Sequence, residues 1–90
     1  MIKERYLEVT FRKGRPLAAY LYFPRRPRSK GARTVDMAPG LLVDFAKNGD
    51  PIGLEITDPT HVTVRQVNRV FKKLGLERLE QNEIKPLRAA

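Results

Sequence analysis

Two carboxylates, Asp44 and Glu55, are the acids in this sequence that pairing of their segments would bring close together. In such a position they could bind a cation, or act as a general acid and a general base. The more ordinary interpretation is a polar sheet face that holds Arg or Lys side chains from the basic segment 12–33, or that meets a dimer partner. We favour the ordinary interpretation, because the sequence indicates no third ligand and no nucleophile beside them.

The chain has one histidine, His61, and one serine, Ser29. A general base needs a nucleophile within reach and a partner that orients it, and Ser29 falls in a segment expected to be a mobile loop. The sequence also lacks a Gly-rich phosphate loop, a His/Cys set with metal-ligand spacing and a nucleophile elbow. We therefore predict that the protein is not an enzyme, with no catalytic residue, no metal and no cofactor, and that His61 is an exposed turn residue.

Positive charge is concentrated in one part of the chain, whose net charge is +8. Between Val9 and Val35 there are eight basic residues and no acid. Residues 1–8 and residues 36–90 each contain as many acidic as basic residues. Such a block steers anionic partners toward itself. The eight residues are Arg12, Lys13, Arg15, Arg25, Arg26, Arg28, Lys30 and Arg33.

Three interpretations of this basic segment stay open. It could dock on an acidic protein surface, bind nucleic acid without sequence preference, or serve only as a solvated loop that keeps the protein soluble. For nucleic acid, Tyr20 and Tyr22 on the adjacent strand would offer stacking surfaces, although they suit sheet packing equally well. We favour protein docking over nucleic acid as the function, because no base-reading motif accompanies the charge.

The segments that carry these residues are predicted to be strands. Residues 4–11 alternate between apolar and polar side chains, and residues 17–23 are almost wholly apolar, with a Gly- and Pro-containing turn between them. The Pro-rich residues 24–31 predict an exposed loop, and residues 32–37 a further strand that ends near Pro39-Gly40. The two first strands should form a hairpin.

A second hairpin is predicted from strands at 41–46 and 52–57. Asn48-Gly49 between them is the dipeptide preferred in a two-residue type I′ turn. With that turn, Asp44 and Glu55 become diagonal neighbours on one face of the sheet. The other face receives three apolar pairs: Phe45 with Ile52, Val43 with Leu54, and Leu41 with Ile56.

An amphipathic helix is predicted over residues 64–74. Thr63 and Gln66 have the spacing of a capping box, and Gly75 suits the left-handed residue that ends a helix. Residues 80–85 should add a short helical turn that Pro86 ends. The expected fold class is α+β, with an antiparallel sheet of three to five strands and one C-terminal helix packed on one face.

Three segments of the chain carry a recognisable pattern: Ala19-Tyr20-Leu21-Tyr22, Pro39-Gly40-Leu41-Leu42-Val43-Asp44-Phe45 and Asn48-Gly49-Asp50-Pro51-Ile52-Gly53-Leu54-Glu55-Ile56. Together they resemble small bacterial proteins classed as a domain of unknown function, family 2283. The resemblance covers roughly residues 17–57. It implies no established activity, although some members look like antitoxin partners of small neighbouring toxins.

The length of ninety residues fits one domain, residues 1–90, of marginal stability. Cysteine is absent, so disulfides and thiolate metal sites cannot supplement the core, and we expect a homodimer. The first residues lack the apolar stretch of a signal peptide, and no run of apolar residues is long enough to span a membrane. A cytoplasmic protein with no membrane partner is therefore expected.

Overall fold

The computed structural model describes residues 5–24 and 31–88. It contains five strands, one α-helix and two 3₁₀ helices. In chain order these are β1 (Tyr6–Arg12), β2 (Arg15–Tyr22), β3 (Gly31–Ala38), β4 (Leu41–Ala46), β5 (Pro51–Ile56), η1 (Pro59–His61), α1 (Val64–Leu74) and η2 (Gln81–Arg88).

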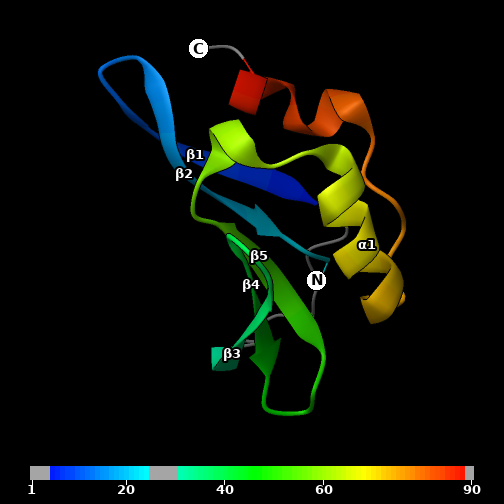
Figure 1. Cartoon of the computed structure of the whole chain (residues 1–90). Helices are drawn as coiled ribbons and strands as arrows, with labels where there is room; N and C mark the ends of the chain where they lie inside the picture. Colours follow the sequence, from blue (N-terminus) through cyan, green and yellow to red (C-terminus); the bar gives the residue numbers. More distant parts are fainter. Residues whose placement is uncertain (1–4, 25–30, 89–90) are drawn as a thin grey trace.

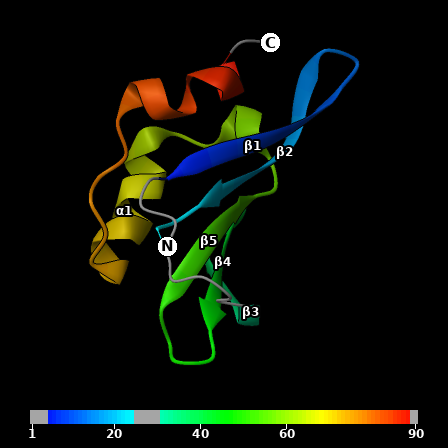
Figure 2. The ribbon, with the colours of Figure 1, turned by 180° about the vertical axis from the view of Figure 1, so that it is seen from behind.

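The five strands form one antiparallel sheet in the order β1-β2-β5-β4-β3 (Figure 1). The helix α1 and the C-terminal η2 cover one face of this sheet, as the view from behind also shows (Figure 2). The predicted α+β class and the helix on one sheet face are confirmed. Because β1 and β3 are the two edge strands, residues on them lie at opposite sides of the molecule.

The covered face of the sheet holds the core. Val43 and Leu54 are fully buried, and Phe45 is 9% exposed. Phe23 packs edge-on against Phe71 of α1, with the ring centroids 5.4 Å apart. From the C-terminal segment, three further apolar side chains complete this cluster: Leu79, Ile84 and Leu87.

The turn of the second hairpin differs from the prediction. Leu41 lies opposite Ile56 and Val43 opposite Leu54, as expected, but Phe45 lies opposite Pro51 because the register shifts after Asp44. A type I′ turn needs a positive φ at both central residues, and here Gly49 has one (96°) whereas Asn48 does not.

A three-residue loop replaces the predicted two-residue turn. The Gly49 N–H donates to the Ala46 carbonyl (2.9 Å), and the Ala46 N–H donates to the Asp50 carbonyl (2.8 Å). The Asn48 side chain also accepts a bond from the Asp50 N–H (3.0 Å). This is a type I turn followed by a left-handed glycine, a loop that the Asn-Gly dipeptide serves as well.

The type I′ geometry occurs instead in the first hairpin. Lys13 (φ 52°) and Gly14 (φ 79°) are both left-handed and form the two-residue connection between β1 and β2. The strand β2 therefore begins at Arg15, before the predicted start at residue 17. Pro16 within β2 lies next to a register shift, which is where a strand tolerates proline.

The ends of α1 have the predicted geometry. The Thr63 hydroxyl accepts a bond from the Gln66 N–H (3.1 Å), and the Gln66 side chain accepts one from the Thr63 N–H (2.8 Å). At the other end Gly75 is left-handed (φ 71°), and the Leu76 N–H donates to the Phe71 carbonyl (3.0 Å). Both caps satisfy backbone groups that the helix leaves unpaired.

The C-terminal helical turn is longer than predicted, because η2 continues through Pro86 to Arg88. A proline lacks its own N–H donor, which ends an α-helix but is tolerated in a short 3₁₀ segment. Ile84 and Leu87 are one 3₁₀ turn apart and both buried, so burial in the core favours continuing the turn. The prediction that Pro86 ends this segment is wrong.

Removing the cap of α1 tests its contribution to stability. Thr63→Ala should lower the free energy of unfolding by about 1 kcal/mol, because the Gln66 N–H loses its acceptor. Chemical denaturation measures this change. Thr63→Ser keeps the hydroxyl and is the control, so an equal loss in both variants would contradict the capping role.

Candidate functional site

Tyrosines and carboxylates form two rows on the sheet face that points away from α1. One row crosses all five strands through Tyr6, Tyr22, Gly53, Asp44 and Thr34; the next runs through Glu8, Tyr20, Glu55, Leu42 and Asp36. These two rows hold four carboxylates and no Lys or Arg. The outer face of the sheet is therefore negative.

Asp44 accepts hydrogen bonds on both of its carboxylate oxygens. The Tyr20 hydroxyl donates to Oδ2 (2.6 Å) and the Thr34 hydroxyl donates to Oδ1. As predicted, Asp44 and Glu55 are diagonal neighbours, since Asp44 lies opposite Gly53 and Glu55 opposite Leu42. These contacts with neutral hydroxyls support a structural role for Asp44 rather than acid–base chemistry.

Gly53 makes the bond between Tyr20 and Asp44 possible. Tyr20 crosses directly over Gly53, and a Cβ atom at residue 53 would lie 2.2 Å from the Tyr20 hydroxyl oxygen. Any larger residue would therefore displace the tyrosine ring. The Tyr20 side chain of β2 thus covers the backbone of β5 at Gly53 on the outer face of the sheet.

The tyrosines predicted as stacking surfaces pack against one another. The Tyr6 and Tyr22 rings are stacked with centroids 4.4 Å apart, and the Tyr20 and Tyr22 centroids are 4.7 Å apart. The Tyr22 hydroxyl donates to the Glu8 carboxylate (3.3 Å). The rings thus lie among carboxylates.

The predicted basic patch is divided by the fold. Arg12, Lys13 and Arg15 are exposed at the tip of the β1–β2 hairpin, whereas Arg33 lies on β3 at the opposite edge of the sheet. The Arg33 guanidinium lies 4.8 Å from the centroid of the Phe45 ring. The remaining predicted members, Arg25, Arg26, Arg28 and Lys30, are outside the described residues.

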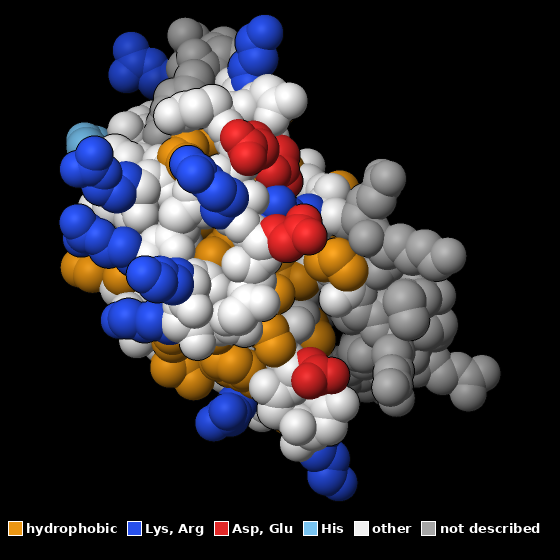
Figure 3. All heavy atoms as spheres, turned by 90° about the vertical axis from the view of Figure 1, so that its right-hand side faces the viewer, with side chains coloured by type: hydrophobic (Ala, Val, Ile, Leu, Met, Phe, Trp, Pro, Cys, Tyr) orange, Lys and Arg blue, Asp and Glu red, His pale blue; other side chains and the backbone are white. Residues whose placement is uncertain are grey.

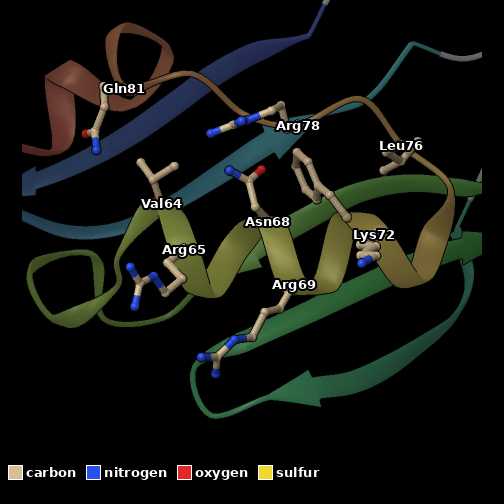
Figure 4. Close-up of a pocket in the computed structure, with 9 residues that line it drawn as sticks. Val64, Arg65, Asn68, Arg69, Lys72, Leu76, Arg78 and Gln81 are labelled. Atoms are coloured by element: carbon tan, nitrogen blue, oxygen red, sulfur yellow. The ribbon is translucent and has the colours of Figure 1, made fainter.

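A second group of cations lines a groove along α1, which we call the α1 groove. Its volume is about 600 Å³. Figure 4 shows the side chains that line it, and Figure 3 shows Lys and Arg side chains gathered on the α1 side of the molecule. The lining residues are Val64, Arg65, Asn68, Arg69, Phe71, Lys72, Leu76, Arg78 and Gln81.

The cations of the α1 groove follow helical spacing. Arg65, Arg69 and Lys72 are exposed and occur at every third or fourth residue, and α1 contains no acid. Arg78 faces them from the segment after the helix (Figure 4). The apolar side chains at the groove are Val64, Phe71 and Leu76.

Hydrogen bonds from two side chains hold residues 77–79, which form the far wall of the groove. Asn68 donates to the Leu79 carbonyl (3.1 Å) and accepts from the Leu79 N–H (2.6 Å). Arg5 donates to the carbonyls of Glu77 (2.6 Å) and Arg78 (3.1 Å) and pairs with the Glu83 carboxylate (2.9 Å). The wall is therefore fixed, although residues 75–80 form no helix or strand.

Residues 18–58 match the model of a family described as a protein of unknown function (DUF2283). The predicted family resemblance is confirmed. No curated protein and no solved structure matches the chain. The DUF2283 segment contains Tyr20, Gly53 and Asp44, whereas the hairpin tip and the α1 groove both lie outside it.

The cationic groove was missed by the sequence analysis, which counted charge by segment. Residues 36–90 contain equal numbers of acidic and basic residues, so the net charge of this segment does not reveal the positive charge of α1. The spacing of Arg65, Arg69 and Lys72 within an acid-free helix was the available signal. Arg5 had no such signal, because its partners follow it by more than seventy residues.

His61 is exposed in η1, as predicted, and its ring Nδ1 lies 2.8 Å from a carboxylate oxygen of Asp58. The hydrogen bond with His61 lowers the pKa of Asp58 below its ordinary value of 3.8. No group of three or more His, Cys, Asp and Glu side chains suited to a metal occurs within residues 5–24 and 31–88. In the same residues no helix is long and apolar enough to cross a membrane.

The contact of Tyr20 with Gly53 can be tested by a double-mutant cycle. Gly53→Ala should destabilise the protein by about 1–3 kcal/mol, because the added methyl group displaces Tyr20 from Asp44. In a Tyr20→Ala background the same change should be neutral or stabilising, since alanine favours a strand more than glycine does. Chemical denaturation of the four proteins measures the coupling; a coupling near zero would contradict the contact.

The pair of Asp58 and His61 predicts a pH effect. Because folding lowers the pKa of Asp58, its contribution to stability is present above the ordinary pKa and is lost as the pH falls through the folded pKa. His61→Ala should return the pKa of Asp58 toward its ordinary value. NMR titration of the carboxyl carbon measures this pKa, and an unchanged value would show that His61 is not the cause.

Proposed function

We propose that this protein is a protein-docking module that binds an acidic segment of a partner protein in the α1 groove. The observation that carries the proposal is the combination of a cationic rim with an apolar base in one groove. An antitoxin-like role, which the family resemblance implies for some members, would be one form of this function.

The charge of the groove supports an anionic occupant. Arg65, Arg69 and Lys72 present three cations along one side of an acid-free helix, and Arg78 adds a fourth from the far wall. Cations arranged in this way raise the association rate of an acidic partner and select against a basic one. Arginine also binds a carboxylate through two parallel hydrogen bonds, which adds geometric specificity.

The shape and the apolar contacts of the groove support a protein segment there rather than a single-stranded nucleic acid. Its volume of about 600 Å³ suits the burial of a few side chains, and Val64 and Leu76, both partly exposed, offer apolar contacts to an anchor. A single-stranded nucleic acid bound at this helix would gain affinity from stacking surfaces beside the cations. The three tyrosines lie instead on the outer face of the sheet, beside Glu8 and Asp44.

The rigid wall supports binding as well. A groove that already has its bound shape loses less conformational entropy when it is filled. Asn68 and Arg5 together fix residues 77–79 by hydrogen bonds to backbone groups. This segment would otherwise have to be ordered by the partner.

Binding to the groove is tested with a labelled acidic peptide that, as a helix, has leucines on one face and glutamates on the other. The double variant Arg65→Glu and Arg69→Glu should weaken binding at least about tenfold, because two attractive charges become repulsive. Fluorescence anisotropy at low salt measures the affinity.

The matched control reverses two exposed lysines that do not line the groove, Lys47→Glu and Lys85→Glu, with the same change in net charge. It should bind the peptide within about twofold of the unchanged protein. Equal losses in both double variants, or no binding of the peptide by the unchanged protein, would refute docking in the groove.

A further inference from the structure

The tip of the β1–β2 hairpin carries three cations around a two-residue turn. Arg12 and Arg15 flank the turn and Lys13 lies within it. The hairpin extends beyond the helices, as both ribbon views show (Figures 1 and 2). From Val9 to Val35 the sequence contains no acid, so the tip has no neighbouring carboxylate along the chain.

The backbone at Lys13 is unfavourable for its residue type. Among the described residues, Lys13 is the one non-glycine residue with a positive φ (52°). Glycine, asparagine and aspartate are the residues that adopt this conformation at low cost, and a type I′ turn normally contains them. The chain therefore keeps a lysine where another residue would make the hairpin more stable.

The positive charges at the tip also repel one another. Arg12 and Arg15 are direct cross-strand partners, and like charges in that position destabilise a sheet. Within the described part of the chain, none of the three cations forms an ion pair. Both unfavourable features concern the same four residues, and departures from local rules concentrate at functional sites.

We propose that this tip binds duplex nucleic acid by contacting backbone phosphates with Arg12, Lys13 and Arg15. A polyanion removes the repulsion between the arginines and explains the lysine in the turn. A hollow of about 440 Å³, lined by these cations together with Pro16 and Leu17, offers a place for a phosphate group. A two-stranded β-ribbon also fits the major groove of a duplex, which is about 12 Å wide.

The apolar groups of the tip favour a duplex over an anionic lipid bilayer. Phe11 and Leu17 are each 51% exposed, so each keeps about half of its surface covered by the protein. Stable attachment to a bilayer needs deeper apolar insertion together with charge. Contact with sugars or base edges needs only the exposed part of these side chains.

This proposal does not depend on the α1 groove, with which the tip shares no residue. Its failure and the failure of peptide docking are therefore separate results. A variant of the tip should leave the affinity for the acidic peptide within about twofold.

The variant Lys13→Asn separates a binding role from a structural one. It removes one cation and introduces a residue that a type I′ turn favours, so the melting temperature should rise. Binding to a duplex of mixed sequence, measured by fluorescence anisotropy over a salt series, should weaken by about fivefold or more at low salt. The slope of log affinity against log salt should become less steep by about 0.9 for the lost phosphate contact.

A second variant and a matched control complete the experiment. Arg15→Glu places a carboxylate opposite Arg12, which should raise the melting temperature and weaken duplex binding more than Lys13→Asn does. Lys47→Asn makes the same substitution in the loop of the second hairpin and should bind the duplex within about twofold of the unchanged protein.

Two results would overturn the proposal. The first is absence of duplex binding by the unchanged protein at low salt. The second is the same affinity and the same salt slope for Lys13→Asn and Lys47→Asn. If the first result occurs and the unchanged protein binds vesicles of phosphatidylserine and phosphatidylcholine in a sedimentation assay more strongly than Lys13→Asn does, the tip binds a lipid bilayer instead.

Discussion

Burial of the β5 strand at the centre of the sheet is the interaction on which the rest of this structure depends. β5 pairs with β2 on one side and β4 on the other, and Leu54 and Ile56 are fully buried. The same apolar face receives Phe71 of α1 and Leu79 of the C-terminal segment. The helix and the extended segment after it are therefore held side by side, and the space between them is the α1 groove.

The two faces of this sheet divide the charge of the molecule. The outer face carries Glu8, Asp36, Asp44 and Glu55 around three tyrosines, whereas α1 on the covered face presents arginines and lysines. These charges favour an anionic ligand at the helix side and at the hairpin tip over one at the tyrosines. Among the described residues, the tyrosines expected to stack therefore do not share one surface with Arg12, Lys13, Arg15 and Arg33.

The DUF2283 segment and the two proposed sites differ in their physical character. Within the segment, Tyr20 over Gly53 and its bond to Asp44 are contacts that satisfy neighbouring residues of the sheet. At the hairpin tip, Lys13 and the facing arginines lower the stability of the hairpin without any described contact that compensates. Contacts of the first kind support the fold, and features of the second kind favour an external partner.

The sequence by itself determined the alternation of β4 and β5, the capped helix and the absence of cysteine, because each follows from local spacing and residue type. Val43 opposite Leu54 and Thr63 with Gln66 were predictable for that reason. Tertiary structure alone decided the strand order, the separation of Arg33 from the hairpin tip, and the clamps made by Arg5 and Asn68. These depend on contacts between residues far apart in the chain, which no local pattern records. The turn type at Asn48-Gly49 has the same origin, since the packing of the strands selects among the turns that this dipeptide can adopt.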